Sequence, residues 1–161
     1  MSAAMRPPLS LKGRALQLLA QREHSVAELR RKLLRHARAD ADDADGADAA
    51  ARIEEVIAWL LAHKHLSEER FVEGRVHARA ARYGNLRIRQ ELAQHGLVLG
   101  ADAARALRDS EFERALQVWQ RKYGTPPADA AERSRQSRFL AQRGFSPEVI
   151  ARVMRRAAQA D

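Results

Sequence analysis

Apolar residues recur at spacings of three and four along almost every part of this chain that lies between helix-breaking residues. No run of four or more residues alternates cleanly between apolar and polar side chains, as a half-buried strand would. Spacings of three and four place apolar side chains on one face of an α-helix. The sequence therefore predicts an all-helical fold. At 161 residues, 45% of them hydrophobic, the chain is long enough to bury a core.

Local capping chemistry marks four helix starts. A Ser or Asp side chain at the N-cap accepts a hydrogen bond from a backbone amide two or three residues further on, and a Glu at the third position can bond back. This pattern occurs as Ser25 with Glu28 and Ser110 with Glu113, and in a weaker form as Asp129 with Glu132. Ser146 is a predicted N-cap of another kind, followed by Pro147 at the first helical position and by the acid Glu148. Helix ends are predicted at Gly84, Gly96, Gly124 and Gly144.

These signals divide the chain into about nine predicted helices. They span residues 10–23, 26–37, 50–64, 67–82, 85–95, 101–108, 110–123, 129–143 and 147–158. When the helices are grouped in threes, the second members align as ELRRKLLRHA, RIRQELAQHG and RQSRFLAQRG. Two of these contain nearly identical segments, LAQHGL at 92–97 and LAQRGF at 140–145. The alignment predicts an internal repeat of a three-helix unit.

We expect the three tandem repeats to cover residues 1–66, 67–109 and 110–161. Repeats of this kind contact chiefly their neighbours, so the fold is predicted to be an elongated, curved array that presents long surfaces to macromolecules. Each LAQ-G segment is predicted to end the second helix of its repeat. Its leucine then packs inward, and its glycine adopts a left-handed turn.

The first repeat carries an insertion at residues 37–50, rich in Asp and Ala. A calcium-binding loop is one alternative, because Asp43, Asp45 and Gly46 have the spacing of its third, fifth and sixth positions. That register places Ala41 at the first ligand position and Arg52 where a bidentate Glu is needed. The segment is therefore interpreted as a solvated linker without a metal.

The net charge of +8 is unevenly distributed. Residues 1–38 have a net charge of +7, residues 39–73 of −7 and residues 74–161 of +8. Arg75, Arg79 and Arg82 have helical spacing, and Arg31, Arg35 and Arg38 repeat it. These stripes predict an acidic partner, either nucleic acid or an acidic protein surface. The alternative is that the arginines form an ordinary solvated helix surface.

Several function classes lack support. The chain has no cysteine, and its longest apolar run, VIAWLLA at 56–62, is too short to cross a bilayer. No HExxH pair, GxSxG turn or phosphate-binding glycine loop occurs. We therefore expect a soluble, cytoplasmic protein with no catalytic residues, metal or cofactor. Most aromatic residues lie on apolar stripes and are predicted to be core, whereas Tyr83, beside Gly84, is the best candidate for exposure.

Three stretches resemble the RecX family of bacterial regulators of the RecA recombinase. They are residues 22–34, 66–97 and 135–154, and the middle one is the most specific. Within it the resemblance rests on Arg70, Phe71, Arg79, Gly84, Arg87, Ile88, Leu92 and Gly96. The closing RFLAQRGFS, with Ile150, is nearly as specific. Family members often have a second glycine before the tyrosine and a proline after the turn glycine, where this chain has Arg82 and Asn85.

The resemblance implies a monomeric, non-enzymatic negative regulator of RecA. Such a protein binds the groove of the RecA filament on single-stranded DNA, blocks its extension and promotes its disassembly, and so modulates recombination, DNA repair and the SOS response. Weak direct binding to DNA is left open. The residues expected to contact filament or DNA are Arg75, Arg79, Arg82, Arg87, Arg89, Arg31, Arg35, Arg135, Arg138 and Arg143.

Two other functions remain as alternatives. A helical DNA-binding transcriptional regulator would use the second helices for recognition and would discriminate between duplex sequences. An enzyme would need a polar cleft with perturbed acidic groups, which the sequence does not indicate.

Overall fold

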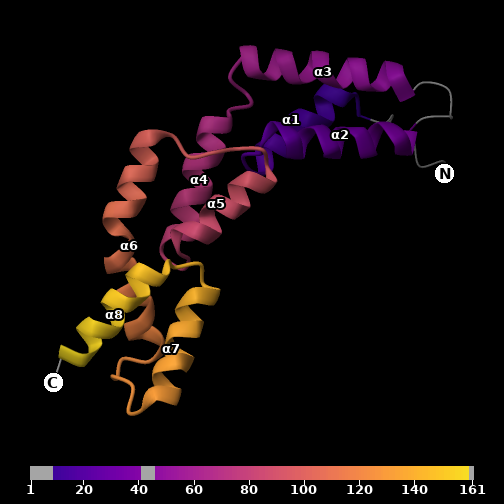
Figure 1. Cartoon of the computed structure of the whole chain (residues 1–161). Helices are drawn as coiled ribbons and strands as arrows, with labels where there is room; N and C mark the ends of the chain where they lie inside the picture. The colour runs from indigo at the N-terminus through magenta and orange to yellow at the C-terminus, as the bar shows by residue number, and fades with distance from the viewer. Residues whose placement is uncertain (1–8, 41–45, 160–161) are drawn as a thin grey trace, which may run out of the picture. The chain divides into compact units, whose positions relative to one another are not determined.

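The computed structural model describes residues 9–40 and 46–159, and within these ranges it contains eight α-helices and no β-strand (Figure 1). The helices are α1 (Leu11–Gln21), α2 (Val26–Asp40), α3 (Gly46–Ala62), α4 (Glu68–Ala80), α5 (Asn85–Gln94), α6 (Ala101–Lys122), α7 (Ala130–Gln142) and α8 (Pro147–Gln159). The predicted all-helical fold is confirmed for the described residues. None of their helices is both long enough and apolar enough to span a bilayer.

The chain divides into two compact units, Met1–Phe71 and Val72–Asp161. In the first unit α1, α2 and α3 pack around one apolar core. Leu29 and Leu33 of α2 and Leu60 of α3 are fully buried there. Truncating a buried leucine to alanine costs about 2–5 kcal/mol, so these side chains account for much of the stability of this unit.

A polar cluster closes the turn between α1 and α2. Arg22 donates two hydrogen bonds to the buried carboxylate of Glu28, and Lys32 Nζ lies 3.4 Å from the same carboxylate. The imidazole of His24 is 1% exposed, and this burial lowers its pKa. A neutral His24 fits its contacts, because Nδ1 can donate to the carbonyl oxygen of Arg22 at 2.9 Å while Nε2 accepts from Lys32 at 2.9 Å.

The second unit has its core between α6, α7 and α8. Trp119 of α6, Leu140 of α7 and Val153 of α8 are buried there. The indole nitrogen of Trp119 donates to the side-chain oxygen of Gln136 at 2.8 Å. This bond satisfies two polar groups that would otherwise be costly to bury.

Three of the four predicted N-caps are confirmed. Each cap side chain accepts a hydrogen bond from a backbone amide in the first turn. The pairs are Ser25 Oγ with the Glu28 amide at 3.1 Å, Asp129 Oδ1 with the Glu132 amide at 2.8 Å, and Ser146 Oγ with the Val149 amide at 3.3 Å.

The predicted helix start at Ser110 is wrong. Ser110 lies inside α6, so the two helices predicted at 101–108 and 110–123 are one continuous helix. Its hydroxyl donates back to the carbonyl oxygen of Leu107 at 3.3 Å and accepts from Arg114 Nε at 3.0 Å. A serine that bonds to the preceding turn is compatible with a helix interior, and no glycine or proline interrupts the chain there.

The prediction of a linker at 37–50 is wrong at both ends. Helix α2 continues to Asp40 and α3 begins at Gly46. The flanking segments are rich in alanine, which has the highest helix propensity. Ala49, in the first turn of α3, is also buried within the first unit. Residues 41–45, which include three of the calcium-loop positions considered above, lie outside the described residues.

The glycines of the two LAQ-G segments do adopt the left-handed conformation, with φ of 70° at Gly96 and 89° at Gly144. The leucines, Leu92 and Leu140, are fully buried as predicted. Gly84 differs from the prediction, because its φ is −81° and it is the N-cap of α5. The reason for a glycine there is a close backbone contact with Gly144.

Candidate basic binding surface

The turns before α5 and before α8 are docked against each other in the second unit. The Gly84 amide donates to the carbonyl oxygen of Arg143 at 2.8 Å, and the Leu86 amide donates to that of Gly144 at 3.1 Å. A Cβ placed on Gly84 would lie 2.3 Å from the Gly144 backbone, and one on Gly144 would lie 2.4 Å from Cβ of Arg87. The small residues are therefore needed for the two turns to approach this closely.

A buried carboxylate supports both turns. Glu111 of α6 is 4% exposed and accepts from the Asn85 amide and from the Ser146 amide, both at 3.3 Å. These amides lie at the N-terminal ends of α5 and α8, where the helix dipole favours a negative charge. One side chain thus holds two helix starts in place.

Arg114 completes this support from the next turn of α6. Its guanidinium donates to the carbonyl oxygens of Ala80 and Tyr83, each at 2.9 Å, and to the side-chain oxygen of Asn85. Burial lowers the pKa of Arg114, and the charge of Glu111 opposes that shift. Since the ordinary pKa of an arginine is far above neutral, the group stays charged and fixes the end of α4.

This support orders a group of side chains that we call the Tyr83 cluster: Tyr83, Arg79, Arg87 and Arg143. The guanidinium carbon of Arg87 lies 3.9 Å from the centre of the Tyr83 ring, that of Arg143 5.4 Å and that of Arg79 5.9 Å. Cations at these distances are attracted to the face of an aromatic ring. Tyr83, expected to be exposed, is instead half-buried under arginines.

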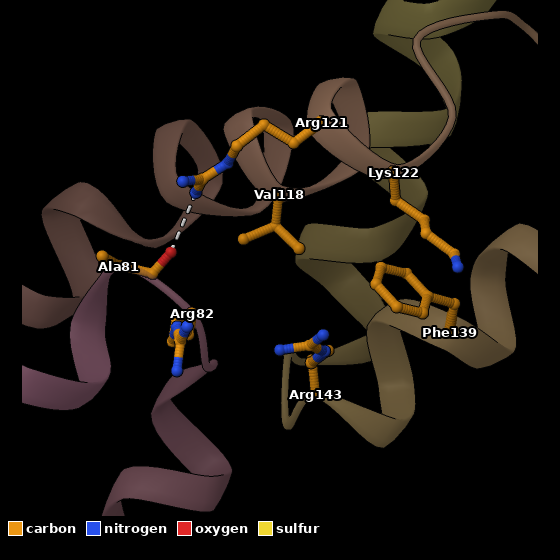
Figure 2. A pocket seen from close by; sticks show the side chains of 7 residues that line it. All are labelled: Ala81, Arg82, Val118, Arg121, Lys122, Phe139 and Arg143. Carbon is orange, nitrogen blue, oxygen red and sulfur yellow. Dashed lines mark hydrogen bonds between the residues drawn. The ribbon is translucent and has the colours of Figure 1, made fainter.

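Next to this cluster lies an open pocket of about 260 Å³, which we call the basic pocket (Figure 2). Its lining contains four cations and no acid. The lining residues are Ala81, Arg82, Val118, Arg121, Lys122, Phe139 and Arg143. Figure 2 shows Val118 at the centre, with Arg121 on one side and Arg143 on the other.

Two of the pocket's arginines are held by contacts within the unit. Arg121 donates to the carbonyl oxygen of Ala81 at 3.0 Å, the dashed line in Figure 2. The guanidinium carbon of Arg143 lies 5.2 Å from the centre of the Phe139 ring, and Lys122 Nζ lies 5.6 Å from the same centre. Arg143 therefore belongs to both the Tyr83 cluster and the basic pocket.

Four of the ten predicted contact residues lie in the Tyr83 cluster or the basic pocket. They are Arg79, Arg82, Arg87 and Arg143. Arg82 lies in the turn beyond the end of α4 rather than on the predicted stripe, and it lines the pocket. Arg79 pairs with Glu91 at 3.0 Å, so part of its charge is neutralised within the fold. This ion pair leaves Arg79 less charge to offer an acidic partner than the other arginines of this region have.

The remaining predicted residues lie outside the Tyr83 cluster and the basic pocket. Arg31 and Arg35 belong to the first unit, where they line an open groove of about 410 Å³ along α2. Arg135 pairs with Glu132 one turn earlier on α7 at 2.6 Å. Of the others, Arg89 and Arg138 are exposed and Arg75 is half-buried.

Sequence reasoning missed Arg121, Lys122 and Phe139. Phe139 was assigned to the core, and it does contact the core of its unit, but it also forms one wall of the pocket. The adjacent cations Arg121 and Lys122 end α6 immediately before a glycine-containing turn. Two adjacent cations at a helix end could have indicated an anion-binding site. The sequence does not show that Arg82, Phe139 and Arg143 line the same pocket.

Comparison with known proteins connects the chain to one family. The family model for the second three-helix domain of RecX matches residues 67–98, and the model for its third three-helix domain matches residues 109–154. The protein named Regulatory protein RecX from Leptothrix cholodnii is 51% identical over 155 residues, which cover 95% of this chain and 92% of that protein. The chain belongs to the RecX family.

Other RecX proteins agree with this assignment. Regulatory protein RecX from Ralstonia nicotianae is 47% identical and is matched over 91% of its length, with 94% of this chain covered. The crystal structure of RecX from Lactobacillus salivarius is 18% identical, with a TM-score of 0.67 over 92% of this chain and 95% of that one. That similarity shows a shared fold.

The residues that carry the RecX resemblance have physical roles in the structure. Arg70 donates to Glu23 at 2.7 Å and to the carbonyl oxygen of Lys64 at 3.0 Å, while Phe71 is buried beside it. Gly84 and Arg87 shape the docked turns and the Tyr83 cluster. The third-domain model of RecX starts at residue 109, inside α6.

Proposed function

We propose that this protein is a negative regulator of the RecA recombinase. It binds along the groove of the RecA filament on single-stranded DNA, blocks filament extension and promotes disassembly, and thereby modulates recombination, DNA repair and the SOS response. The observation that carries the proposal is the match to a protein named Regulatory protein RecX over 95% of the chain.

The Tyr83 cluster and the exposed Arg89 supply the contact surface in this proposal. Arg87 is stacked on a ring and Arg143 is held between two rings, so less side-chain entropy is lost when they bind than for free arginines. A guanidinium fork suits the carboxylates of an acidic protein surface and the phosphates of DNA. Electrostatic attraction of this kind increases the association rate and decreases with added salt.

We also propose that the eight helices act as three repeats, residues 1–66, 67–109 and 110–161. Helix α6 then serves two repeats, because the boundary falls within it. Its first half is the third helix of the second repeat, and its second half is the first helix of the third. Several separate weak contacts along such a chain would act together through their high effective concentration.

The test compares two double variants in a RecA assay. Wild-type protein is added to RecA on single-stranded DNA, and ATP turnover and strand exchange are measured. We expect inhibition at sub-stoichiometric ratios. The variant Arg87→Glu with Arg89→Glu, both on α5, should inhibit much more weakly because two contact charges are reversed.

The matched control is Arg105→Glu with Arg108→Glu, which reverses two charges at exposed positions on α6 outside the Tyr83 cluster and the basic pocket. It should inhibit like the wild type. If both variants lost inhibition equally, the inhibition of RecA would depend on net charge and not on this surface. Sequence-specific duplex binding without RecA would instead favour a helical transcriptional regulator.

A further inference from the structure

The basic pocket has a composition that the fold alone does not require. Four cations, Arg82, Arg121, Lys122 and Arg143, converge on about 260 Å³, and no acid lines that space. Within the described residues, no ion pair joins any of the four to a carboxylate. Like charges so close repel one another, so an unoccupied pocket is electrostatically unfavourable and an anion would relieve that cost.

We propose that the basic pocket binds a phosphate group, presented either by a single-stranded nucleic acid or by a free nucleotide. A phosphate offers several oxygens and up to two negative charges, so it can accept from three or four donors at once. A carboxylate has two oxygens and is satisfied by a single guanidinium fork. Three guanidinium groups and an ammonium in one pocket therefore match phosphate better than an acidic side chain.

The geometry of the lining supports a small ligand. Arg121 is anchored by hydrogen bonds to the carbonyl oxygens of Ala81 and Gln117, at 3.0 and 3.4 Å, and these leave other donors of its guanidinium unused. Arg143 is held near the Phe139 ring. The volume lies just below the range of roughly 300–1,000 Å³ typical of pockets for drug-sized ligands, which suits a phosphate with its adjoining sugar.

The apolar wall has a role in the same proposal. Val118 and Phe139 contribute carbon surface beside the four cations. A bare inorganic anion makes little use of such a surface, whereas the sugar of a nucleotide unit can contact it. A phosphate carried on a nucleoside should therefore bind more tightly than phosphate alone.

This inference goes beyond the proposed function, because it requires no RecA. It assigns a ligand class to Arg121, Lys122 and Phe139, which form no part of the proposed RecA contact surface. A protein could regulate RecA through α5 without this pocket, and the pocket could hold a phosphate in a protein that does not bind RecA. The two proposals can therefore fail separately.

The experiment measures binding in the absence of RecA with three fluorescent probes: an oligothymidylate, an N-methylanthraniloyl-labelled ADP, and a polyglutamate peptide. The test variant is Arg121→Gln with Lys122→Gln. The control is Arg105→Gln with Arg108→Gln, which removes the same charge from the same helix at exposed positions. Circular dichroism melting confirms that each variant is folded.

We expect the pocket variant to bind the oligothymidylate or the nucleotide at least about tenfold more weakly, since the loss of one charge-assisted hydrogen bond weakens binding by about tenfold or more. The affinity of the control variant should change by no more than about twofold. For the oligothymidylate, the slope of log affinity against log salt should fall by about 0.7, because the pocket holds one phosphate and each phosphate contact on a single strand contributes about that much. Whichever probe responds identifies the source of the phosphate.

Three outcomes would overturn the proposal. In the first, the wild-type protein binds neither phosphate probe. In the second, the pocket variant and the control lose the same affinity for these probes. The third is polyglutamate binding as tight and as pocket-dependent as that of the phosphate probes, which would assign the pocket to an acidic peptide. If the double variant does not fold, Arg82→Gln provides the same test from the turn after α4, where the side chain is exposed.

Discussion

Gly84 and Gly144 lie backbone against backbone, so that a single added methyl group on Gly84 would sit 2.3 Å from the carbonyl carbon of Gly144. This contact joins the turn before α5 to the turn before α8, and it positions Arg87 and Arg143 on either side of it. The basic surface of the second unit therefore depends on two residues that have no side chain.

Gly84→Ala should destabilise the protein by about 1–3 kcal/mol or more, because the clash is with backbone that cannot rotate away. The matched control is Gly74→Ala in α4, where a Cβ meets nothing within 4 Å. Alanine in a helix interior is favoured over glycine, so the control should gain about 0.5–1 kcal/mol. Urea unfolding followed by circular dichroism measures both, and equal stability of Gly84→Ala and wild type would disprove the close contact.

Glu111→Gln should reduce stability by about 1–3 kcal/mol. The amide keeps one acceptor oxygen but loses the charge, so one of the two backbone donors at Asn85 and Ser146 is left without its partner. Glu113→Gln is the control, since Glu113 lies on the same helix and is exposed. Thermal unfolding of the two variants should differ clearly, and similar melting curves would contradict the role given to Glu111.

Stability at acid pH should depend on Glu28. Burial opposes ionisation of this carboxyl, but the Arg22 hydrogen bond, the charges of Arg22 and Lys32, and the charge that His24 gains when it is protonated at acid pH lower its pKa to about 2. Because the folded pKa lies below the unfolded value of 4.5, the stabilisation is fully present above pH 4.5 and is lost as pH falls towards 2. Glu28→Gln should remove about 3 kcal/mol at neutral pH and flatten the stability profile in that window.

The control for this pH experiment is Glu54→Gln. Glu54 also pairs with an arginine, Arg30 at 2.6 Å, but its side chain is 55% exposed. Solvent and salt screen such a surface pair, so removal of its charge should leave stability nearly unchanged. Identical acid profiles for Glu28→Gln and wild type would show that the buried cluster does not contribute as described.

Tyr83→Leu should weaken inhibition of RecA about two- to fivefold, because the ring that orders Arg87 and Arg143 is removed while both charges remain. The reporter is the concentration that half-inhibits RecA ATP turnover on single-stranded DNA. Tyr83→Phe retains the ring and should behave as wild type. An unchanged value for Tyr83→Leu would show that stacking does not prepare these arginines for binding.

The features that sequence reasoning predicted correctly depend on local chemistry. The caps at Ser25, Asp129 and Ser146 involve residues within three positions of one another, and the left-handed glycines at 96 and 144 follow from their place after a helix. Ser110 has the same local pattern as a cap, yet its hydroxyl bonds backward into a continuous helix. A capping pattern alone does not distinguish the two cases.

The candidate site was predicted only in part, because it depends on contacts between distant segments. Arg82, Arg87 and Arg143 were among the expected contact residues, but the pairing of Arg79 with Glu91 across two helices was not predicted. The pocket between the end of α4, the end of α6 and α7 forms from residues as far apart in the chain as Ala81 and Arg143. Such juxtapositions follow from packing, which a helical pattern does not specify.

The proposal that this protein blocks the extension of RecA filaments and promotes their disassembly is tested most directly by following single filaments. RecA filaments grow on fluorescently labelled single-stranded DNA, and their length is recorded over time. The account predicts that the wild-type protein, added below the concentration of RecA, stops extension and then shortens existing filaments. Filaments that grow at the same rate and keep their length with equimolar protein would contradict it.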